Sequence, residues 1–167
     1  LAEGYYSTAI GHGANAKAAR TLAAGHGAIA SGDNATAVGL DSKSKGEAAT
    51  AIGNASLAEG YYSTAVGAEA QAKKDFDLAA GHDAIASGKQ STAVGYKTQA
   101  SGRASFAQGS FALASGDASI SIGEYSSATG TDAIALGADS KANEFRAVAL
   151  GASSNATKAN GIAIGNT

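Results

Sequence analysis

The sequence predicts an all-β fold, a parallel β-roll or solenoid of about twelve coils with fourteen residues in each coil. One glycine recurs every fourteen residues along the chain without an insertion, and the residues before it alternate between small and larger side chains. Alternation with a period of two is the pattern of a β-strand, and a fixed repeat along the whole chain is typical of solenoids.

The first strand of each predicted coil ends at this recurring glycine. Two residues before the glycine stands Ala in eleven rows and Ser121 in the other, whereas the residues one and three before it are mostly Ile, Val, Leu or Thr. The glycines are Gly11, Gly25, Gly39, Gly53, Gly67, Gly81, Gly95, Gly109, Gly123, Gly137, Gly151 and Gly165. Each coil therefore has a short strand with a constant small residue on one face and larger residues on the other.

A second short strand is predicted in the other half of each coil, where segments such as Ala28–Ser31 alternate in the same way. A second glycine recurs there at Gly4, Gly32, Gly46, Gly60, Gly88, Gly102, Gly116 and Gly130, and is replaced by Ala18, Lys74, Glu144 and Lys158. We expect a tight turn with positive φ at each glycine, because glycine adopts that conformation without strain. Leu1–Ala9 recurs 56 residues later as Leu57–Ala65, which indicates extension by duplication.

A coiled coil is the alternative to a roll, because fourteen residues are also two heptads. A glycine about every seven residues would cost a helix about 1 kcal/mol each, and the β-branched residues have a spacing of two. Within the roll, we expect the Ile, Val and Thr side chains to face the small residues of the second strand, with the constant Ala column pointing outward. Such a thin roll is predicted to be marginal alone and to pack against copies of itself through the Ala column.

Short segments at the end of the first strand carry a family resemblance. Ser7–Gly11, Ser63–Gly67 and Ser91–Gly95 each read Ser-Thr-Ala, then Ile or Val, then Gly, and the register continues over twelve rows. They resemble the head repeats of trimeric autotransporter adhesins, the YadA-like heads. The resemblance implies that residues 1–167 form one YadA-like head repeat domain, a left-handed parallel β-roll assembled as a homotrimer. The Asn that usually precedes the Ser in this family is replaced here by Tyr6, Tyr62 or Gln90, and Asn34 precedes Ala35, so collagen binding tied to that motif is not carried over.

Composition narrows the classes of function. The chain has no Cys, Met, Pro or Trp, and it contains neither a signal peptide nor an apolar stretch long enough to span a membrane. We therefore expect a fragment of a longer surface fibre whose membrane anchor lies outside this segment. A net charge of -2 provides no basic stripe for phosphates, so a nucleic acid partner is not expected.

The polar residues predict no catalytic, cofactor-binding or metal site. His12, His26 and His82 each follow a recurring glycine, so His12 and His26 are expected to stack on adjacent coils, as exposed turn residues or as the start of a metal site. The carboxylates fall in or near turns without a recurrent pair, at Asp33, Asp41, Glu47, Glu69, Asp83, Asp117, Glu124, Asp132 and Asp139. The aromatic residues Tyr5, Tyr6, Tyr61, Tyr62, Phe76 and Phe145 precede the first strand, where they are expected to cover roll edges, to pack between protomers or to anchor a partner.

These observations predict a non-enzymatic adhesion module without a cofactor, exported to the cell surface at the outer membrane of a Gram-negative bacterium. Its expected partners are two further copies of itself and, on the host, extracellular-matrix proteins or cell-surface receptors. A passive spacer within the fibre remains the alternative. An ice-binding solenoid is disfavoured because Thr8, Thr36, Thr50, Thr64 and Thr92 occur once per row and are expected to face the core.

Overall fold

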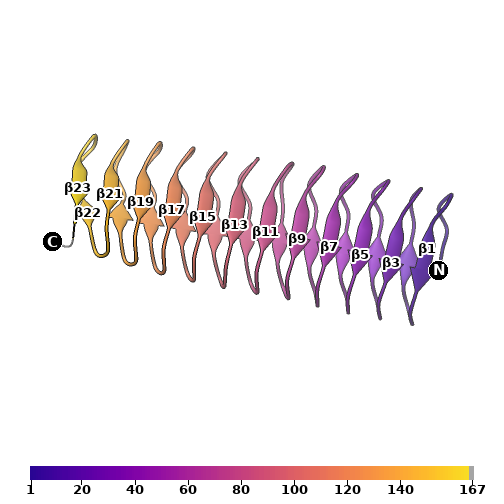
Figure 1. The fold of residues 1–167 in the computed structure, drawn as a ribbon. Coiled ribbons are helices and arrows are strands. Elements are labelled where there is room, and N and C mark those ends of the chain that lie inside the picture. Colours follow the sequence, from indigo (N-terminus) through magenta and orange to yellow (C-terminus); the bar gives the residue numbers. More distant parts are fainter. Residues whose placement is uncertain (166–167) are drawn as a thin grey trace.

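A computed structural model describes residues 1–165, and in it the chain winds into a single row of stacked coils with its two ends at opposite ends of the row (Figure 1). Each coil contains a three-residue strand, a turn, a two-residue strand and a second turn. Strands of the same kind stack in parallel, so the molecule consists of one 12-stranded and one 11-stranded sheet. About eleven turns of the predicted solenoid are therefore present.

The first sheet contains the odd-numbered strands and the second sheet the even-numbered strands. The first comprises β1 (Thr8–Ile10), β3 (Leu22–Ala24), β5 (Thr36–Val38), β7 (Thr50–Ile52), β9 (Thr64–Val66), β11 (Leu78–Ala80), β13 (Thr92–Val94), β15 (Phe106–Gln108), β17 (Ile120–Ile122), β19 (Ile134–Leu136), β21 (Val148–Leu150) and β23 (Ile162–Ile164). The second comprises β2 (Asn15–Ala16), β4 (Ile29–Ala30), β6 (Lys43–Ser44), β8 (Leu57–Ala58), β10 (Gln71–Ala72), β12 (Ile85–Ala86), β14 (Gln99–Ala100), β16 (Leu113–Ala114), β18 (Ser127–Ala128), β20 (Lys141–Ala142) and β22 (Asn155–Ala156). Every pairing is shifted by one coil, as in Ala37 with Ala51, which confirms the fourteen-residue period.

The interior of the roll overturns the predicted orientation of the first strand. The constant Ala column points inward and is fully buried, as at Ala37, Ala65 and Ala135, whereas the Ile, Val, Leu and Thr columns point outward. Among residues 1–165, the buried apolar side chains are all alanines, and the largest fully buried side chains are Thr98 and Asp77. The Ala stripe that was expected to join copies of the chain is therefore the core of each copy.

Short turns explain why only small side chains fit inside. Four residues join Ala24 to Ile29 and five join Ala30 to Thr36, so the two sheets are held close together. Sheets that interdigitate large side chains lie about 10 Å apart, which these turns do not allow. Polar residues share the interior because they bond locally. Ser126 and Ser140, for example, donate from Oγ to the carbonyl oxygens of Gly123 and Gly137 at 2.9 and 2.8 Å.

The recurring glycines of the two turns in each coil differ in backbone conformation. The glycine turn, which leads from the first sheet to the second, starts at the recurring glycine with positive φ, as at Gly67 (131°), in agreement with the prediction. The return turn leads back to the first sheet, and its glycine does not have positive φ, contrary to the prediction. A Cβ at Gly102 would lie 2.0 Å from the carbonyl oxygen of Gly116, so the coils stack too closely there for a side chain. Positive φ in the return turn falls two residues later, on residues such as Ala104.

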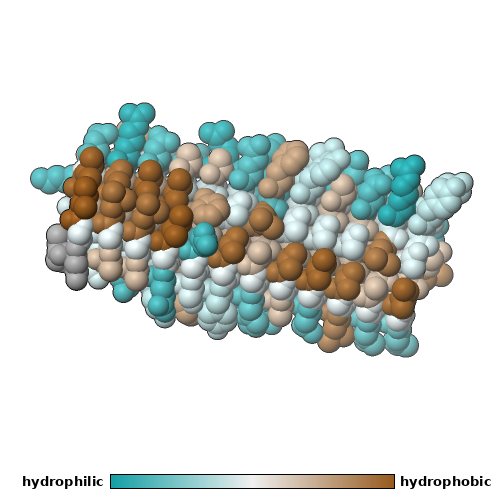
Figure 2. All heavy atoms as spheres, viewed as in Figure 1, coloured by the Kyte–Doolittle hydropathy of each residue, from teal (hydrophilic) through white to brown (hydrophobic). Residues whose placement is uncertain are grey.

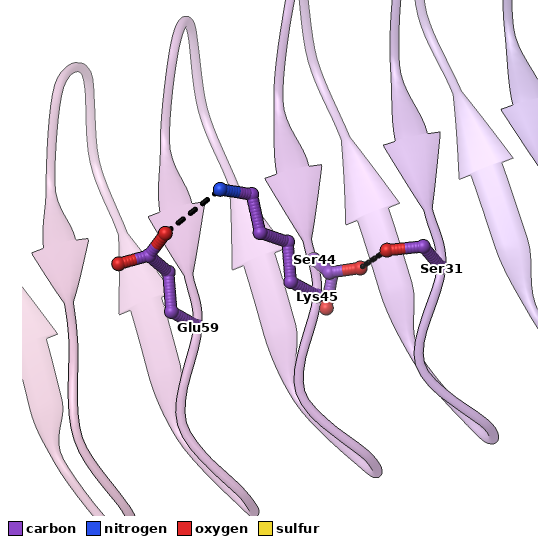
Figure 3. A network of polar contacts seen from close by, with 4 residues as sticks. All are labelled: Ser31, Ser44, Lys45 and Glu59. Carbon is purple, nitrogen blue, oxygen red and sulfur yellow. Dashed lines mark hydrogen bonds and ion pairs between the residues drawn. The ribbon is translucent and has the colours of Figure 1, made fainter.

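Contacts between adjacent coils fix the register of the stack. Lys45 Nζ lies 2.7 Å from Glu59 Oε1 on the next coil, and Ser31 Oγ donates to the carbonyl oxygen of Ser44 at 3.4 Å (Figure 3). Asp117 Oδ1 accepts the backbone N–H of Arg103 on the preceding coil at 2.9 Å. In the part of the chain that the structure describes, there is no helix of the length and apolarity needed to span a membrane.

Candidate functional site

The outer face of the first sheet carries most of the larger aliphatic side chains. Two columns point outward on each strand, at the first and third positions. On β17, β19, β21 and β23 both columns are aliphatic, which gives a broad apolar area at the C-terminal end of the rod (Figure 2). This C-terminal aliphatic patch consists of Ile120, Ile122, Ile134, Leu136, Val148, Leu150, Ile162 and Ile164.

Toward the N-terminal end the apolar area narrows to one column (Figure 2). On β5, β7 and β9 the first position is Thr and the third is Val or Ile, of which Ile52 and Val66 are 41% and 39% exposed. The threonines share this outer face, so the expectation that they face the core was wrong. The residue two positions after each of them is Val38, Ile52 or Val66, so the paired threonine array expected of an ice-binding face does not occur on these strands.

A stripe of aromatic side chains runs along the glycine turns. This edge of the roll is the one opposite the return turns. Phe111 and Tyr125 stack with their ring centroids 4.9 Å apart, Tyr96 packs perpendicular to Phe111 at 5.3 Å, and His82 lies 5.5 Å from Tyr96. This stripe was not predicted from the sequence, because His82 and Tyr96 are the second residues of their turns, whereas Phe111 and Tyr125 are the third. Stacking of the coils brings the second and third turn residues of neighbouring coils into contact. Writing the sequence in rows of fourteen places these residues in different columns and does not show the contact.

A shallow hollow borders this aromatic stripe. It has a volume of about 180 Å³ and is lined by Lys97, Gln99, Phe111, Ala112 and Leu113. Gln99 and Leu113 are the outward residues of β14 and β16, so the hollow lies where the glycine turns meet the outer face of the second sheet. Lys97 Nζ lies 5.3 Å from the ring centroid of Tyr96 and 6.0 Å from that of Phe111, distances at which the rings attract the ammonium group.

The predicted aromatic residues gather along the return turns. Phe76 lies 5.7 Å from Tyr61 and 6.1 Å from Tyr62, measured between ring centroids, and Tyr5 and Tyr6 pack against each other at 4.1 Å. Desolvation raises the pKa of Tyr61, and its hydrogen bond with Tyr62 adds to that rise. These rings lie along the return-turn edge of the roll and pack against one another, and Tyr62 and Phe76 are half exposed.

His12 and His26 stack as predicted, with their ring centroids 5.1 Å apart. Within residues 1–165, no three His, Asp or Glu side chains are grouped to hold a metal ion. Several predicted carboxylates instead stabilise turns. Asp33 Oδ1 accepts the N–H of Ala19, and Asp132 lies 3.6 Å from the guanidinium of Arg146 on the next coil.

Asp77 is a buried carboxylate that was not predicted from the sequence. Its side chain is 1% exposed inside the roll, at a position where the two neighbouring coils carry Ser63 and Ser91. Lys74 N donates to Oδ2 at 2.8 Å, and Ser91 donates to Oδ1 from its backbone N at 2.9 Å and from Oγ at 3.0 Å. Burial raises the pKa of Asp77, against the opposing effect of these three donors.

Comparison with family models assigns the chain to a family. The model of the YadA head domain repeat, which spans two copies of the repeat, matches residues 2–28, 16–42, 44–70, 72–98, 86–112, 100–126, 114–140, 128–144 and 142–167. A comparison with curated proteins gives no match. The matches cover nearly the whole chain, and successive ones are offset by one or two fourteen-residue coils, the period of the observed solenoid. The chain therefore belongs to the family of YadA head domain repeats, the head modules of trimeric autotransporter adhesins.

Proposed function

We propose that this chain is a single adhesive head domain that works as a homotrimer of left-handed rolls on the surface of a Gram-negative bacterium and binds host macromolecules. The observation that carries the proposal is the division of apolar residues between the two faces of the first sheet. Small residues, mostly alanine, fill the interior, while Ile, Val and Leu occupy the outward third position in most coils, with Ala24, Ala80 and Gln108 as the exceptions. A stripe of aliphatic side chains along a rod is the kind of surface that copies of a chain cover in an oligomer.

Covering the first sheet in this way leaves the second sheet and both rows of turns exposed. The same backbone then presents similar surfaces many times along three chains, without a deep pocket. Weak contacts that engage together gain about 10²–10⁴ in affinity over a single contact. A host matrix or cell surface, where ligands are dense, is the kind of target that such an array suits, and no bond-breaking chemistry is needed for this role.

Two measurements test the proposal. Light scattering of the purified protein is expected to give three times the mass of one chain, and a folded monomer would contradict the assembly. The intact protein is also expected to bind immobilised extracellular-matrix proteins or host cells, with a steep loss of binding as the ligand density falls. A trimer that binds no matrix protein and no host cell would instead be the passive spacer that the sequence left open.

A further inference from the structure

We propose that the hollow between the aromatic stripe and the second sheet binds a carboxylate-bearing sugar residue within a host surface glycan. The inference rests on the proposed adhesive function and names a ligand class for one place on the rod. The hollow is lined by Lys97, Gln99, Phe111, Ala112 and Leu113. Since Gln99 and Leu113 project from the second sheet, the hollow stays open when copies of the chain cover the first sheet.

The walls of the hollow favour a negatively charged group. Phe111 stacks against Tyr125 of the next coil and packs perpendicular to Tyr96 of the preceding coil, so the rings hold one another in place beside the hollow. Lys97 adds a full positive charge beside these rings, and among the described residues its ammonium group forms no ion pair within the chain.

The remaining wall suits a sugar better than a simple anion. Gln99 provides an amide that both donates and accepts hydrogen bonds, as sugar hydroxyls require. Leu113 and Ala112 provide an apolar surface for the C–H groups of a pyranose ring. The volume of about 180 Å³ lies below the ~300 Å³ at which pockets for drug-sized ligands begin, so the hollow accommodates one sugar unit of a longer chain.

An acidic peptide is a poorer candidate because the backbone around the hollow is already paired. Gln99 N donates to the carbonyl oxygen of Ala112 at 2.9 Å, and Leu113 N donates to that of Ser126 at 2.9 Å. A peptide that lies here has no free strand edge to join, so its own amides lose water without gaining a partner. A glycan has no such amide backbone to satisfy and keeps its outer hydroxyls in water.

The test measures binding of a hexuronic acid oligosaccharide to the intact protein by NMR, with the carboxyl-reduced form of the same oligosaccharide as the matched ligand control. We expect the acidic form to bind, with shifts at the Lys97 and Phe111 signals, and the reduced form to bind at least about tenfold more weakly, since a charge-assisted hydrogen bond is lost. Equal binding of the two forms, or no shift at these two residues, would overturn the proposal.

Variants of the intact protein localise the effect. Lys97→Gln and Phe111→Ala are each expected to weaken binding of the acidic oligosaccharide by about tenfold or more, because each removes a wall of the hollow. Lys43→Gln removes the same charge from an exposed position on β6 and is expected to bind as the unchanged protein does. Ala55 occupies the same turn position as Phe111 in another coil, so the backbone there accepts Ala. Thermal melts of each variant and of the unchanged protein check that the variants fold. Equal losses for Lys97→Gln and Lys43→Gln, or equal competition by an oligoglutamate peptide, would overturn the proposal.

The result is separable from the proposed function. If the protein adheres to host cells but binds no hexuronic acid oligosaccharide, only the ligand of the hollow is wrong. If the oligosaccharide binds and Lys97→Gln abolishes this binding, the hollow is a glycan site even where no host cell is bound, and host adhesion alone fails.

Discussion

The coils around β5, β7 and β9 and those of β17 to β23 have the same backbone and an interior of the same small residues, mostly alanine, but different outer faces. In the first group, here called the threonine coils, Thr36, Thr50 and Thr64 stand beside Val38, Ile52 and Val66. In the second group, both outer columns belong to the C-terminal aliphatic patch. The roll is therefore specified by small residues that both groups share, while association depends on residues that differ between them. We expect substitutions of interior residues to impair folding equally in the two regions. Substitutions of outward residues are expected to impair assembly more in one region than in the other.

The largest expected effect comes from enlarging the interior, and it should be the same in both regions. Ala65 in the threonine coils and Ala135 beside the patch are both fully buried. Ala65→Leu and Ala135→Leu each place a large side chain in the interior. Overpacking on this scale costs about 3 kcal/mol or more of the free energy of unfolding per chain. Circular dichroism is expected to show loss of the β signal and of the melting transition in both variants.

Ala24→Leu is the matched control for these changes. Ala24 lies in the outward column of β3, where Leu136 and Leu150 stand in other coils, so the larger side chain is expected to be accepted. If Ala24→Leu destabilises as much as Ala65→Leu, the assignment of inner and outer columns is wrong.

The second largest effect should separate the two regions. Ile134→Glu with Leu136→Glu places charges in the C-terminal aliphatic patch, and Thr64→Glu with Val66→Glu places them in the threonine coils. Full burial of each aliphatic side chain is worth about 1.5–3 kcal/mol, and every copy in an oligomer carries the change. We expect the first pair to dissociate the oligomer in light scattering and the second pair to lower its thermal stability without dissociating it. Equal effects of the two pairs would show that the patch holds the copies together no better than the threonine coils do.

The repeat made most of the fold predictable from the sequence. Which face of the first strand lies inside the roll was not predictable in this way. The glycine column and the alternation before it gave the strands, the parallel stacking and the register. Alternation alone does not say which face is inside, and the usual preference of larger apolar side chains for the interior misassigned Ala37 and Val38. The four-residue glycine turn, such as Gly25–Ala28 between β3 and β4, sets the distance between the sheets and therefore the size of the side chains that fit.

The candidate site was less predictable than the fold, because it depends on neighbours from different columns. Phe111 and Tyr96 occupy different turn positions, so only the stacked coils show that their rings meet. His12 and His26 share a column, and their stacking was predicted correctly from that fact. Asp77 stands in a column of small residues, mostly Ser and Ala, and its burial follows from that column once the inner face is known.

A smaller effect is expected from Asp77, which lies between the two regions. Because burial raises its pKa above the unfolded value, Asp77 favours folding when protonated, and this contribution is lost as the pH rises through the pKa of the folded state. Asp77→Ser introduces the residue of the neighbouring coils at Ser63 and Ser91. Relative to the unchanged protein, the variant should gain stability at neutral pH, and the gain should shrink in acid.

Thermal melts between neutral and acidic pH measure this difference. Asp139→Ser is the control, since it removes an exposed turn carboxylate at a position that Ser153 occupies in the next coil. An advantage of Asp77→Ser over the unchanged protein that does not vary with pH would contradict the role given to burial of the carboxylate.

The smallest effect is expected from the exposed ion pairs between adjacent coils. Their coupling energies should be similar in the two regions. Lys45 and Glu59 lie 2.7 Å apart near the threonine coils, and Arg146 and Asp132 lie 3.6 Å apart beside the C-terminal aliphatic patch. All four side chains are partly or largely exposed, so double-mutant cycles should give a coupling of only about 0.2–1 kcal/mol for each pair, reduced further by salt. A clearly larger and salt-insensitive coupling for Arg146 and Asp132 would mean that this pair is dehydrated in the assembled protein. The covered surface would then extend from the aliphatic patch around the return turns, and the proposed interface would be wider than the first sheet.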